Sequence, residues 1–226
     1  LTATAVPRVQ TDICEQLCLQ SPQIVKSSFD RPNLHLAIYR KPLGGTVVAF
    51  QKLVTEMNRK PTDNSTIIYA PTQKDVEKIT SLLSAQLNNI CLVMAYHAGL
   101  PSEKREEAHR AYLTGRCQIV VATVAFGMGI DKPDTRRVIH FGSPKTIEEY
   151  YQQVGRAGRD GLPGECYMYA DLHDFGRYKD DFYLGSLNPI AKKAVLNSLE
   201  SLQSMSMSET DCRRKLLLQF FEEVPQ

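Results

Sequence analysis

Short apolar segments alternate with amphipathic ones along most of the chain. Thr66–Ala70 and Ile119–Thr123 are short apolar runs of the kind that forms buried strands. Residues 73–87, between them, repeat apolar side chains at helical spacing: Val76, Ile79, Leu83 and Leu87. Strands that alternate with helices form βαβ units, whose strands are parallel and whose helices cover the sheet. The pattern therefore predicts an α/β fold, with a parallel sheet covered by helices on both faces.

The same patterns predict the other elements. The expected strands are Gln23–Val25, Leu34–Tyr39, Thr66–Ala70, Ile90–Ala95, Ile119–Thr123, Arg137–Phe141 and Glu165–Tyr169. The expected helices are Pro7–Leu19, Gln73–Leu87, Pro101–Thr114 and a further one with Val47, Phe50, Val54 and Met57 on one face. Thr72 and Asp75 cap the start of the second of these, and Gly115 ends the third. Lys60–Asn64 is expected to be a loop.

The alternation stops after Asp171, which predicts a small helical appendage. Its first long helix is expected to begin at Asn188-Pro189 and to bury Ile190, Ala194 and Leu202. Residues 204–208 are serine-rich and are expected to form a polar linker. A last helix is expected over residues 211–221.

Composition limits the class of protein. A hydrophobic content of 42% in 226 residues is enough for a proper core, while a net charge of +2 does not by itself indicate a nucleic-acid partner. The six cysteines are scattered without a Cys-x-x-Cys pair, which favours a reduced intracellular protein. No apolar run reaches membrane-spanning length, so no membrane partner is expected. Because the chain begins at Leu1 without a signal peptide or an initiator methionine, we expect a fragment of a longer protein.

Residues 150–161 place two arginines among three glycines, after a glutamine. The capping box at 146–149 predicts a short helix that ends near Gly155. The following turn would present Arg156 and Arg159 at its exposed edge. Guanidinium groups are planar, fork-shaped and permanently charged, so they suit the oxygens of a polyphosphate. The sequence therefore predicts a nucleotide-phosphate site, with a polar turn of solvated arginines as the alternative.

Several polar residues follow the predicted strands. The carboxyl ends of parallel strands lie at one edge, where ligands of open sheets bind. Phosphate contacts that do not depend on sequence are expected there, by the set Thr72, Lys74, His97, Thr123 and Lys145. As alternatives, Thr72 is also a helix cap and His97 could bond a backbone carbonyl.

Residues 127–131, Gly-Met-Gly-Ile-Asp, suggest contact with a nucleotide. Glycines let the backbone approach a ligand closely, and Asp131 could accept a hydrogen bond from a ribose hydroxyl. The alternative is a glycine turn before Pro133. The sequence contains neither a Gly-x-x-x-x-Gly-Lys-Ser/Thr phosphate loop nor an apolar run that ends in Asp-Glu. It therefore carries the arginine half of an ATPase site without the half that binds ATP.

Three motifs resemble those of RecQ helicases, a family within helicase superfamily two. They are Gln152-x-x-Gly155-Arg156-x-Gly158-Arg159-Asp160-Gly161, residues 122–132 and Tyr96–Leu100. The resemblance implies a RecA-like second motor lobe of an ATP-dependent 3′-5′ DNA helicase. It assigns ATP binding to five residues and makes the two arginines among them catalytic arginine fingers: Gln152, Gly129, Asp131, Arg156 and Arg159. It also implies that the carboxyl-edge set above, Thr72, Lys74, His97, Thr123 and Lys145, holds the single-stranded DNA backbone. Some RecQ relatives carry an arginine at the position of Gln73, so one DNA contact is expected to be weaker here.

The resemblance also implies a domain plan. Residues 1–28 would be the end of the first lobe and a linker, with a Thr-Ala-Thr-Ala motif in Leu1–Ala5; 29–175 would be the second lobe. Residues 176–226 would begin a zinc-binding subdomain, in which Cys212 is the first of four zinc ligands, and one cysteine cannot hold zinc.

The implied cofactors are ATP and Mg²⁺, which need the missing first lobe, and Zn²⁺ in the full-length protein. The implied partners are single-stranded and duplex DNA and that first lobe, in the nucleus if the source is a eukaryote. An RNA helicase lobe, and a nucleic-acid-binding or docking module without ATPase activity, remain as alternatives.

Overall fold

A six-stranded parallel sheet forms the centre of the computed structural model, which describes residues 7–60, 65–127 and 130–224. The strand order is β1-β6-β5-β2-β4-β3. The strands are β1 (Leu34–Tyr39), β2 (Thr66–Tyr69), β3 (Val93–Tyr96), β4 (Ile119–Ala122), β5 (Arg137–Phe141) and β6 (Gly164–Tyr169). In the centre of the sheet, Ile67 of β2 lies opposite Val120 of β4 and Val138 of β5.

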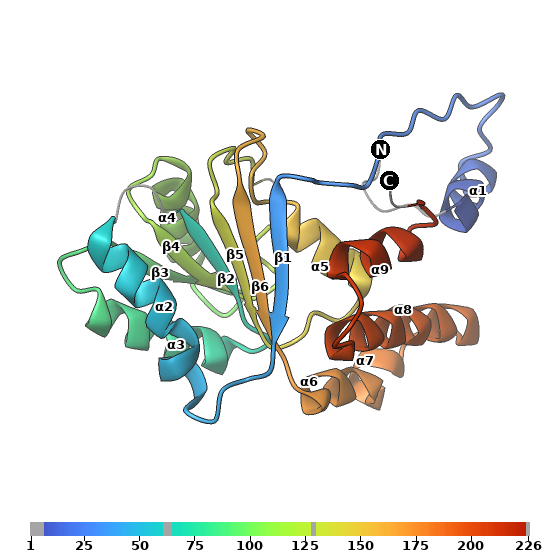
Figure 1. The fold of residues 1–226 in the computed structure, drawn as a ribbon. Coiled ribbons are helices and arrows are strands. Elements are labelled where there is room, and N and C mark those ends of the chain that lie inside the picture. The colour runs from blue at the N-terminus through green and yellow to red at the C-terminus, as the bar shows by residue number, and fades with distance from the viewer. Residues whose placement is uncertain (1–6, 61–64, 128–129, 225–226) are drawn as a thin grey trace.

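Helices cover both faces of this sheet (Figure 1). Alternate residues of each strand point to opposite faces, so Ile67 and Ile68 belong to two separate buried clusters. One cluster contains residues of α2 (Gly45–Arg59) and α3 (Gln73–Gln86). The other contains residues of α4 (Ser102–Leu113) and α5 (Ile147–Val154). The predicted fold class, a parallel α/β sheet with helices on both faces, is confirmed.

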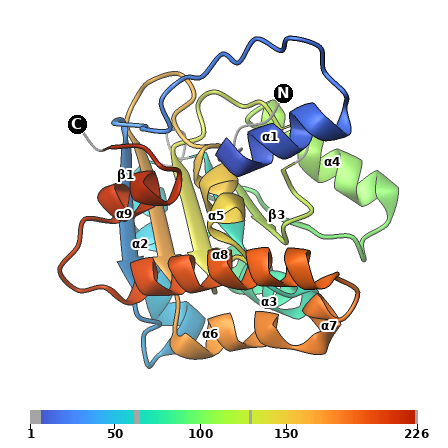
Figure 2. The same ribbon diagram turned by 90° about the vertical axis from the view of Figure 1, so that its right-hand side faces the viewer.

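The helices after β6 pack on the α5 side of the sheet (Figure 2). They are α6 (Leu172–Gly176), a 3-10 turn at Arg177–Lys179, α7 (Asp181–Leu184), α8 (Pro189–Met207) and α9 (Arg213–Phe220). Ile147 of α5 donates its backbone N–H to Ser198 Oγ of α8 at 3.1 Å. The expected helical appendage is therefore present, and this hydrogen bond joins its helix α8 to α5.

Four local predictions are wrong. Gln23–Val25 forms no strand; Val25 is 94% exposed and no neighbouring strand pairs with it. Helix α8 continues through the expected linker to Met207, with Met205 and Ser206 buried. Ser206 Oγ donates to the carbonyl of Leu202 at 2.7 Å, so its hydroxyl is satisfied within the helix.

The third wrong prediction concerns the inward face of α8, and the fourth concerns the length of the first helix. Ile190 is 70% exposed and Ala194 is also exposed, because the first turns of this helix extend beyond α5; only Leu202 of the expected three is buried. The first helix, α1 (Pro7–Gln16), is also shorter than expected.

Other predictions fall outside the described residues: Leu1–Ala5 and most of the 60–64 loop. The division of the chain at residues 29 and 176 stays a prediction. Among the described helices, none combines the length and the apolar character that crossing a membrane requires.

Candidate functional site

The two arginines lie on the turn that joins α5 to β6, here called the arginine turn (residues 155–161). Helix α5 begins where Thr146 Oγ1 accepts the backbone N–H of Glu149, as predicted, and ends at Gly155. Gly158 has a φ of +56°, and a Cβ added there would lie 2.7 Å from the carbonyl oxygen of Leu162. Only glycine fits this backbone.

An ion pair holds Asp160, near the C-terminal end of the arginine turn. Arg136 Nη2 donates to both carboxylate oxygens of Asp160, at 2.7 and 2.6 Å. These hydrogen bonds hold the pKa of Asp160 below its usual value. The arginine turn is thus tied to the segment that leads into β5.

Both arginines contact the segment that follows β4, at Gly127, Ile130 and Asp131. Arg156 Nη1 donates to the carbonyl of Gly127 at 2.5 Å. Arg159 Nη1 donates to the carbonyl of Ile130 at 3.1 Å and to Asp131 Oδ1 at 2.8 Å. Arg159 lies at the exposed edge, as expected, whereas Arg156 is half-buried because it packs on Gly127. Two motifs that are separate in the sequence therefore form one site.

The charge of Arg156 has no counter-ion in the described part of the chain. No carboxylate there forms an ion pair with it, and its buried Nε has no hydrogen-bond partner among the described residues. Its neighbour Tyr69 donates to the carbonyl of Phe126 at 2.8 Å. Burial raises the pKa of Tyr69 to about 12, against the opposing effect of Arg156, so the phenol is neutral. A half-buried, unpaired guanidinium next to a neutral phenol favours an anionic ligand.

Of the other predicted nucleotide contacts, Asp131 and Gln152 lie near the two arginines, and Gly129 is outside the described residues. Asp131 is 83% exposed and forms its ion pair with Arg159. Gln152 is exposed on α5, one turn before Arg156. The roles of all three in ATP binding stay predictions.

The expected DNA contacts lie along the carboxyl edge of four adjacent strands. Thr72 follows β2, His97 follows β3, Thr123 follows β4 and Lys145 follows β5. Lys74 is exposed in the first turn of α3. The parallel sheet thus brings this set to one edge, and what it binds stays a prediction.

Two members of this set are engaged within the chain. Thr72 Oγ1 accepts from the backbone N–H of Asp75 at 3.1 Å and donates to Asp75 Oδ2 at 2.6 Å, so the helix-cap interpretation holds. Lys145 Nζ donates to the carbonyl of Tyr183 at 3.3 Å and lies over its ring. A phosphate would have to compete with these contacts or share them.

His97 is the member whose environment is least satisfied. Its side chain is almost fully buried, yet neither ring nitrogen has a hydrogen-bond partner in the described part of the chain. Glu77 Oε1 lies 3.6 Å from Nε2, beyond hydrogen-bond distance. Among the described residues, no backbone carbonyl accepts a hydrogen bond from His97, in contrast to the alternative that the sequence left open. A buried imidazole without partners is costly unless a ligand supplies one.

A cavity of about 260 Å³ lies at the same edge, between the ends of β2 and β5 and the appended helices. Lys145, Tyr69, Tyr178 and Tyr183 line it, with His140 beneath them. His140 Nε2 lies 2.7 Å from Gln153 Oε1. Burial lowers the pKa of His140 to about 4, so the buried ring is neutral.

We expect the free energy of unfolding to decrease as the pH falls, because His140 is buried as a neutral ring. The ordinary pKa of histidine is 6.5 and the folded value is about 4. As the pH falls, the unfolded chain therefore takes up the proton before the folded chain does. The stability that the neutral His140 ring contributes above pH 6.5 is lost as the pH falls toward 4. The free energy of unfolding should fall by about 2 kcal/mol between pH 7 and pH 5 from this residue alone.

Denaturant unfolding at both pH values tests this expectation. The His140→Phe variant, which has no titrating ring there, should lose about 2 kcal/mol less than the parent. His35 is exposed, so His35→Phe serves as the control and should keep the parent slope. Equal slopes in the parent and His140→Phe would contradict the expectation.

The predicted zinc ligand lies at the other end of the appendage. Cys212 is exposed at the start of α9. In the described ranges, no group of three or more His, Cys, Asp or Glu side chains could hold a metal ion. The zinc role of Cys212 stays a prediction that depends on residues beyond this chain.

Sequence reasoning missed two residues that contact the arginine turn. Arg31 Nη2 donates to the carbonyls of Ala157 and Gly158, and Asn33 Nδ2 donates to those of Gly158 and Leu162. More than 120 residues separate the partners. The sequence signal is that Phe29–Asn33, the stretch before β1, resembles the RecQ lobe junction, which by itself assigned no contact to either residue.

Comparison with known proteins places the site in context. Residues 48–161 match the family described as helicase conserved C-terminal domain. The provisionally named ATP-dependent RNA helicase R290 of Acanthamoeba polyphaga mimivirus is 42% identical over 99% of this chain and 39% of its own length. The bifunctional 3′-5′ exonuclease/ATP-dependent helicase WRN of Mus musculus is 40% identical over 99% of this chain and 16% of its own length.

Similarity to RecQ helicases is thus spread over nearly the whole chain, at identities of 36–40%. The solved structure of S. cerevisiae Dbp5 bound to RNA and ADP BeF3 aligns with 88% of this chain and 54% of its own, at a TM-score of 0.63 and 19% identity. That likeness shows the fold, which is the RecA-like fold of a helicase C-terminal lobe. The chain spans well under half the length of R290 and WRN.

Proposed function

The chain belongs to the helicase conserved C-terminal domain family, and we propose on this basis that it is the second motor lobe of a RecQ-type, ATP-dependent DNA helicase. Residues 29–175 form the lobe, 1–28 lead into it from the first lobe, and 176–226 begin a zinc-binding subdomain. In the full-length protein, the first lobe binds ATP and Mg²⁺. The motor moves 3′ to 5′ on DNA, and a eukaryotic source would place it in the nucleus.

The observation that carries the proposal is the pair of arginines on one turn, which contact Gly127, Ile130 and Asp131. Arg159 has a carboxylate partner that is mostly exposed, and Arg156 has none in the described part of the chain. The γ-phosphate of ATP, bound to the first lobe, would supply the missing anion. Charge builds on the phosphoryl group as it transfers, and guanidinium groups stabilise that charge.

The carboxyl edge of the sheet holds the DNA strand in this proposal. The cations Lys74 and Lys145 lie there, after the neighbouring strands β2 and β5, and the unsatisfied His97 follows β3, two strands from β2. Contacts of this kind bind phosphates and read no bases. The affinity for a DNA strand is therefore expected to be independent of the DNA sequence.

Single-residue variants test this strand-binding edge. Lys74→Ala and Lys145→Ala should each weaken single-stranded DNA binding, by about two- to tenfold, and reduce the salt slope of log K by about 0.7. The loss should be equal for every DNA sequence, measured by fluorescence anisotropy at several salt concentrations. Lys78→Ala, one helical turn further along α3, is the matched control and should bind as the parent. Unchanged binding in both test variants would remove these lysines from the site.

An RNA helicase lobe is the second candidate, and one observation favours it. The viral relative R290, at 42% identity, carries a provisional RNA helicase name. Phosphate contacts alone do not distinguish the two strands, since only RNA offers a 2′-hydroxyl. Unwinding assays of the full-length protein on DNA and RNA duplexes of one sequence separate the candidates. A non-motor docking module would unwind neither.

A further inference from the structure

Residues 28–34, which lead into β1, are here called the junction segment. Their side chains reach the backbone of the arginine turn. Arg31 Nη2 donates to the carbonyl of Gly158 at 2.8 Å and to that of Ala157 at 3.1 Å. Asn33 Nδ2 donates to the Gly158 carbonyl at 2.9 Å. Two side chains of the junction segment thus bind one carbonyl, at the glycine whose backbone no other residue fits.

Two of the three turn residues that Arg31 contacts lie between the two functional arginines, and the third, Gly155, precedes Arg156. Ala157 and Gly158 separate Arg156 from Arg159, so the positions of their carbonyl groups set where both side chains leave the backbone. Arg31 itself bonds backbone oxygen atoms of the turn. Any effect on a nucleotide would therefore pass through Arg156 and Arg159.

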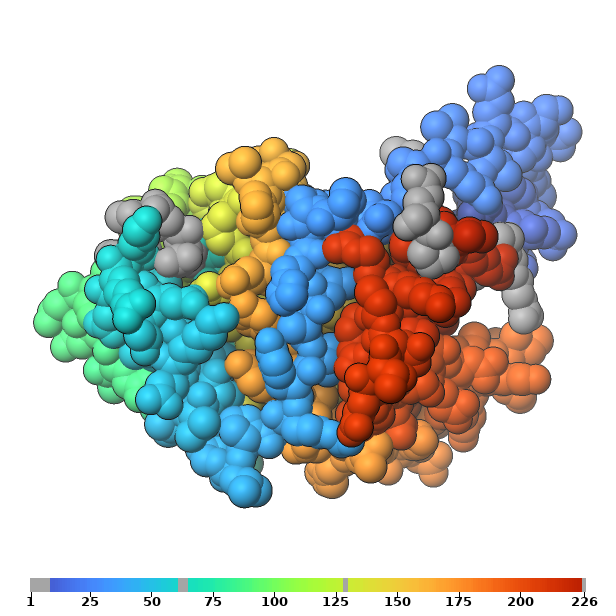
Figure 3. Space-filling view, in the orientation of Figure 1, coloured from blue at the N-terminus to red at the C-terminus, as the bar shows by residue number. Residues whose placement is uncertain are grey.

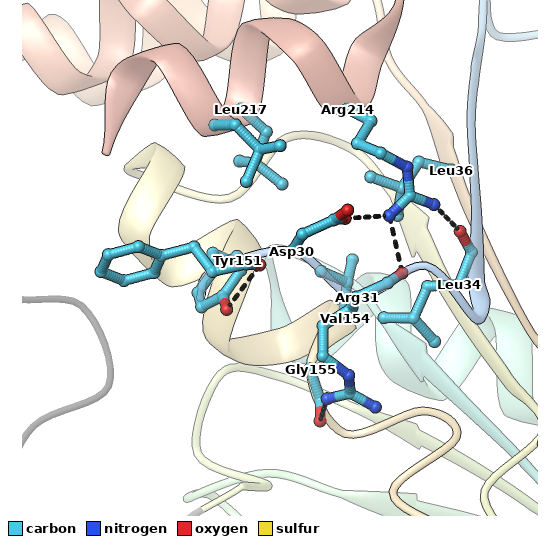
Figure 4. Close-up of a pocket in the computed structure, with 11 residues that line it drawn as sticks. Asp30, Arg31, Leu34, Leu36, Tyr151, Val154, Gly155, Arg214 and Leu217 are labelled. Carbon is cyan, nitrogen blue, oxygen red and sulfur yellow. Dashed lines mark hydrogen bonds and ion pairs between the residues drawn. The ribbon is translucent and has the colours of Figure 1, made fainter. Parts of the chain in front are cut away.

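The junction segment is in turn held by α9. Arg214 Nη1 forms an ion pair with Asp30 and donates to the carbonyl of Arg31 at 2.7 Å (Figure 4). Its Nη2 donates to the carbonyl of Leu34 at 2.6 Å. Near the end of α9, Glu223 Oε2 accepts the backbone N–H of Phe29 at 2.7 Å. Both ends of the junction segment are therefore attached to the appendage.

Aromatic packing joins the same three elements. The Phe29 ring stacks on Phe221, with centroids 4.5 Å apart, and Tyr151 of α5 donates its hydroxyl to the Phe29 carbonyl at 3.0 Å. The cavity left between them is only about 10 Å³, about the smallest space that can hold one water molecule. Figure 3 shows α9 lying directly against β1. The space is thus filled by protein rather than open to a ligand, and α9, the junction segment and α5 should move as one unit.

We propose that Arg31 is a positioning residue for Arg156 and Arg159, and that Arg214 holds Arg31 in place. The inference rests on the function proposed above, since it matters only if these arginines act on ATP. It makes α9, the helix that follows Cys212 in the proposed zinc subdomain, a support for the ATP site. Loss of Arg31 leaves the nucleotide in place but lets the turn shift, so turnover falls while ATP affinity is kept.

The test uses the full-length protein with single-stranded DNA and ATP. Arg31→Gln should lower kcat at least tenfold, with less than twofold change in the Kd for ATP and for DNA. Arg214→Gln should lower kcat about threefold, again with less than twofold change in the Kd for ATP and for DNA. Arg213 is adjacent and bonds only the carbonyl of Asp211 among the described residues, so Arg213→Gln is the matched control and should keep the parent kcat.

A combined variant distinguishes positioning from a general loss of structure. If Arg31 acts through Arg156 and Arg159, then adding Arg31→Gln to a variant that carries both Arg156→Ala and Arg159→Ala should lower kcat by less than twofold more. An equal loss in both backgrounds would overturn the inference. Should Arg31→Gln fold poorly, Arg31→Lys replaces it: one ammonium cannot reproduce the two-nitrogen contact, so an intermediate kcat is expected and a parent kcat overturns the inference.

The two proposals can fail separately. If Arg159→Ala loses turnover while Arg31→Gln keeps it, only the positioning role is wrong. If Arg159→Ala keeps parent turnover, the proposed function is wrong and the positioning role falls with it.

Discussion

The 226-residue chain alone will hydrolyse no ATP above the buffer rate, whereas the full-length protein will hydrolyse ATP when single-stranded DNA is present. The chain has no phosphate loop to hold the β- and γ-phosphates and no Asp-Glu run to hold Mg²⁺. Arginines alone stabilise a transition state only when another element has placed the phosphates beside them. Phosphate release from both proteins, with and without DNA, measures the difference.

Two controls make this comparison decisive. Circular dichroism must show that the isolated chain is folded. The Arg159→Ala form of the isolated chain identifies contamination, since a contaminating ATPase would work equally well in both preparations. Turnover by the isolated chain that disappears in its Arg159→Ala form would contradict the two-lobe account.

Local patterns predicted much of the fold because most strands are short, apolar and flanked by capped helices. Helix α3 was predicted within one residue, since Thr72 caps it and its apolar stripe faces the sheet. The failures have physical causes. Gln23–Val25 has strand-like residues but no neighbour to pair with, and pairing is what makes a strand.

The appendage was harder to predict for the opposite reason. Serines near residue 206 favour linkers in an exposed chain, but α8 buries Ser206 and satisfies its hydroxyl on the Leu202 carbonyl. Tertiary packing therefore outweighed local preference. The exposed Ile190 shows the same limit, because periodicity does not say where the neighbouring element ends.

The candidate site was predictable in its residues and unpredictable in its contacts. Glycine spacing identified the arginine turn, and parallel topology brought the carboxyl-edge residues together. The bond from Arg156 to Gly127 and those from Arg31 to the turn depend on strand order, which places β6 between β1 and β5. The spacing of residues along the sequence does not show which strands lie next to each other in the sheet.

In the full-length protein, we expect Arg159→Ala to reduce kcat on the order of 10³-fold while changing ATP affinity little. Charge grows on the transferring phosphoryl group, so a guanidinium at that place acts mostly in the transition state. The ion pair of Arg159 with Asp131 opposes this only weakly, because Asp131 is 83% exposed and such pairs contribute about 0–1 kcal/mol. Arg159 can therefore exchange that partner for a phosphate.

Related variants should follow the same logic. Arg159→Lys should recover only part of the rate, since one ammonium cannot reproduce a bidentate fork. Arg156→Ala should also lower turnover, and it removes the bond to Gly127 as well. Arg116 is exposed between α4 and β4, so Arg116→Ala is the control and should keep the parent rate. DNA binding without nucleotide should survive every one of these changes.

The most direct measurement is therefore kcat beside the Kd for ATP in the parent and in Arg159→Ala, with both proteins folded and saturated with single-stranded DNA. The two-lobe account predicts a kcat lower by about three orders of magnitude at nearly unchanged Kd. A parent kcat in Arg159→Ala would contradict it and would leave the arginine turn with a structural role, held to residues 127–131 by the ion pair with Asp131.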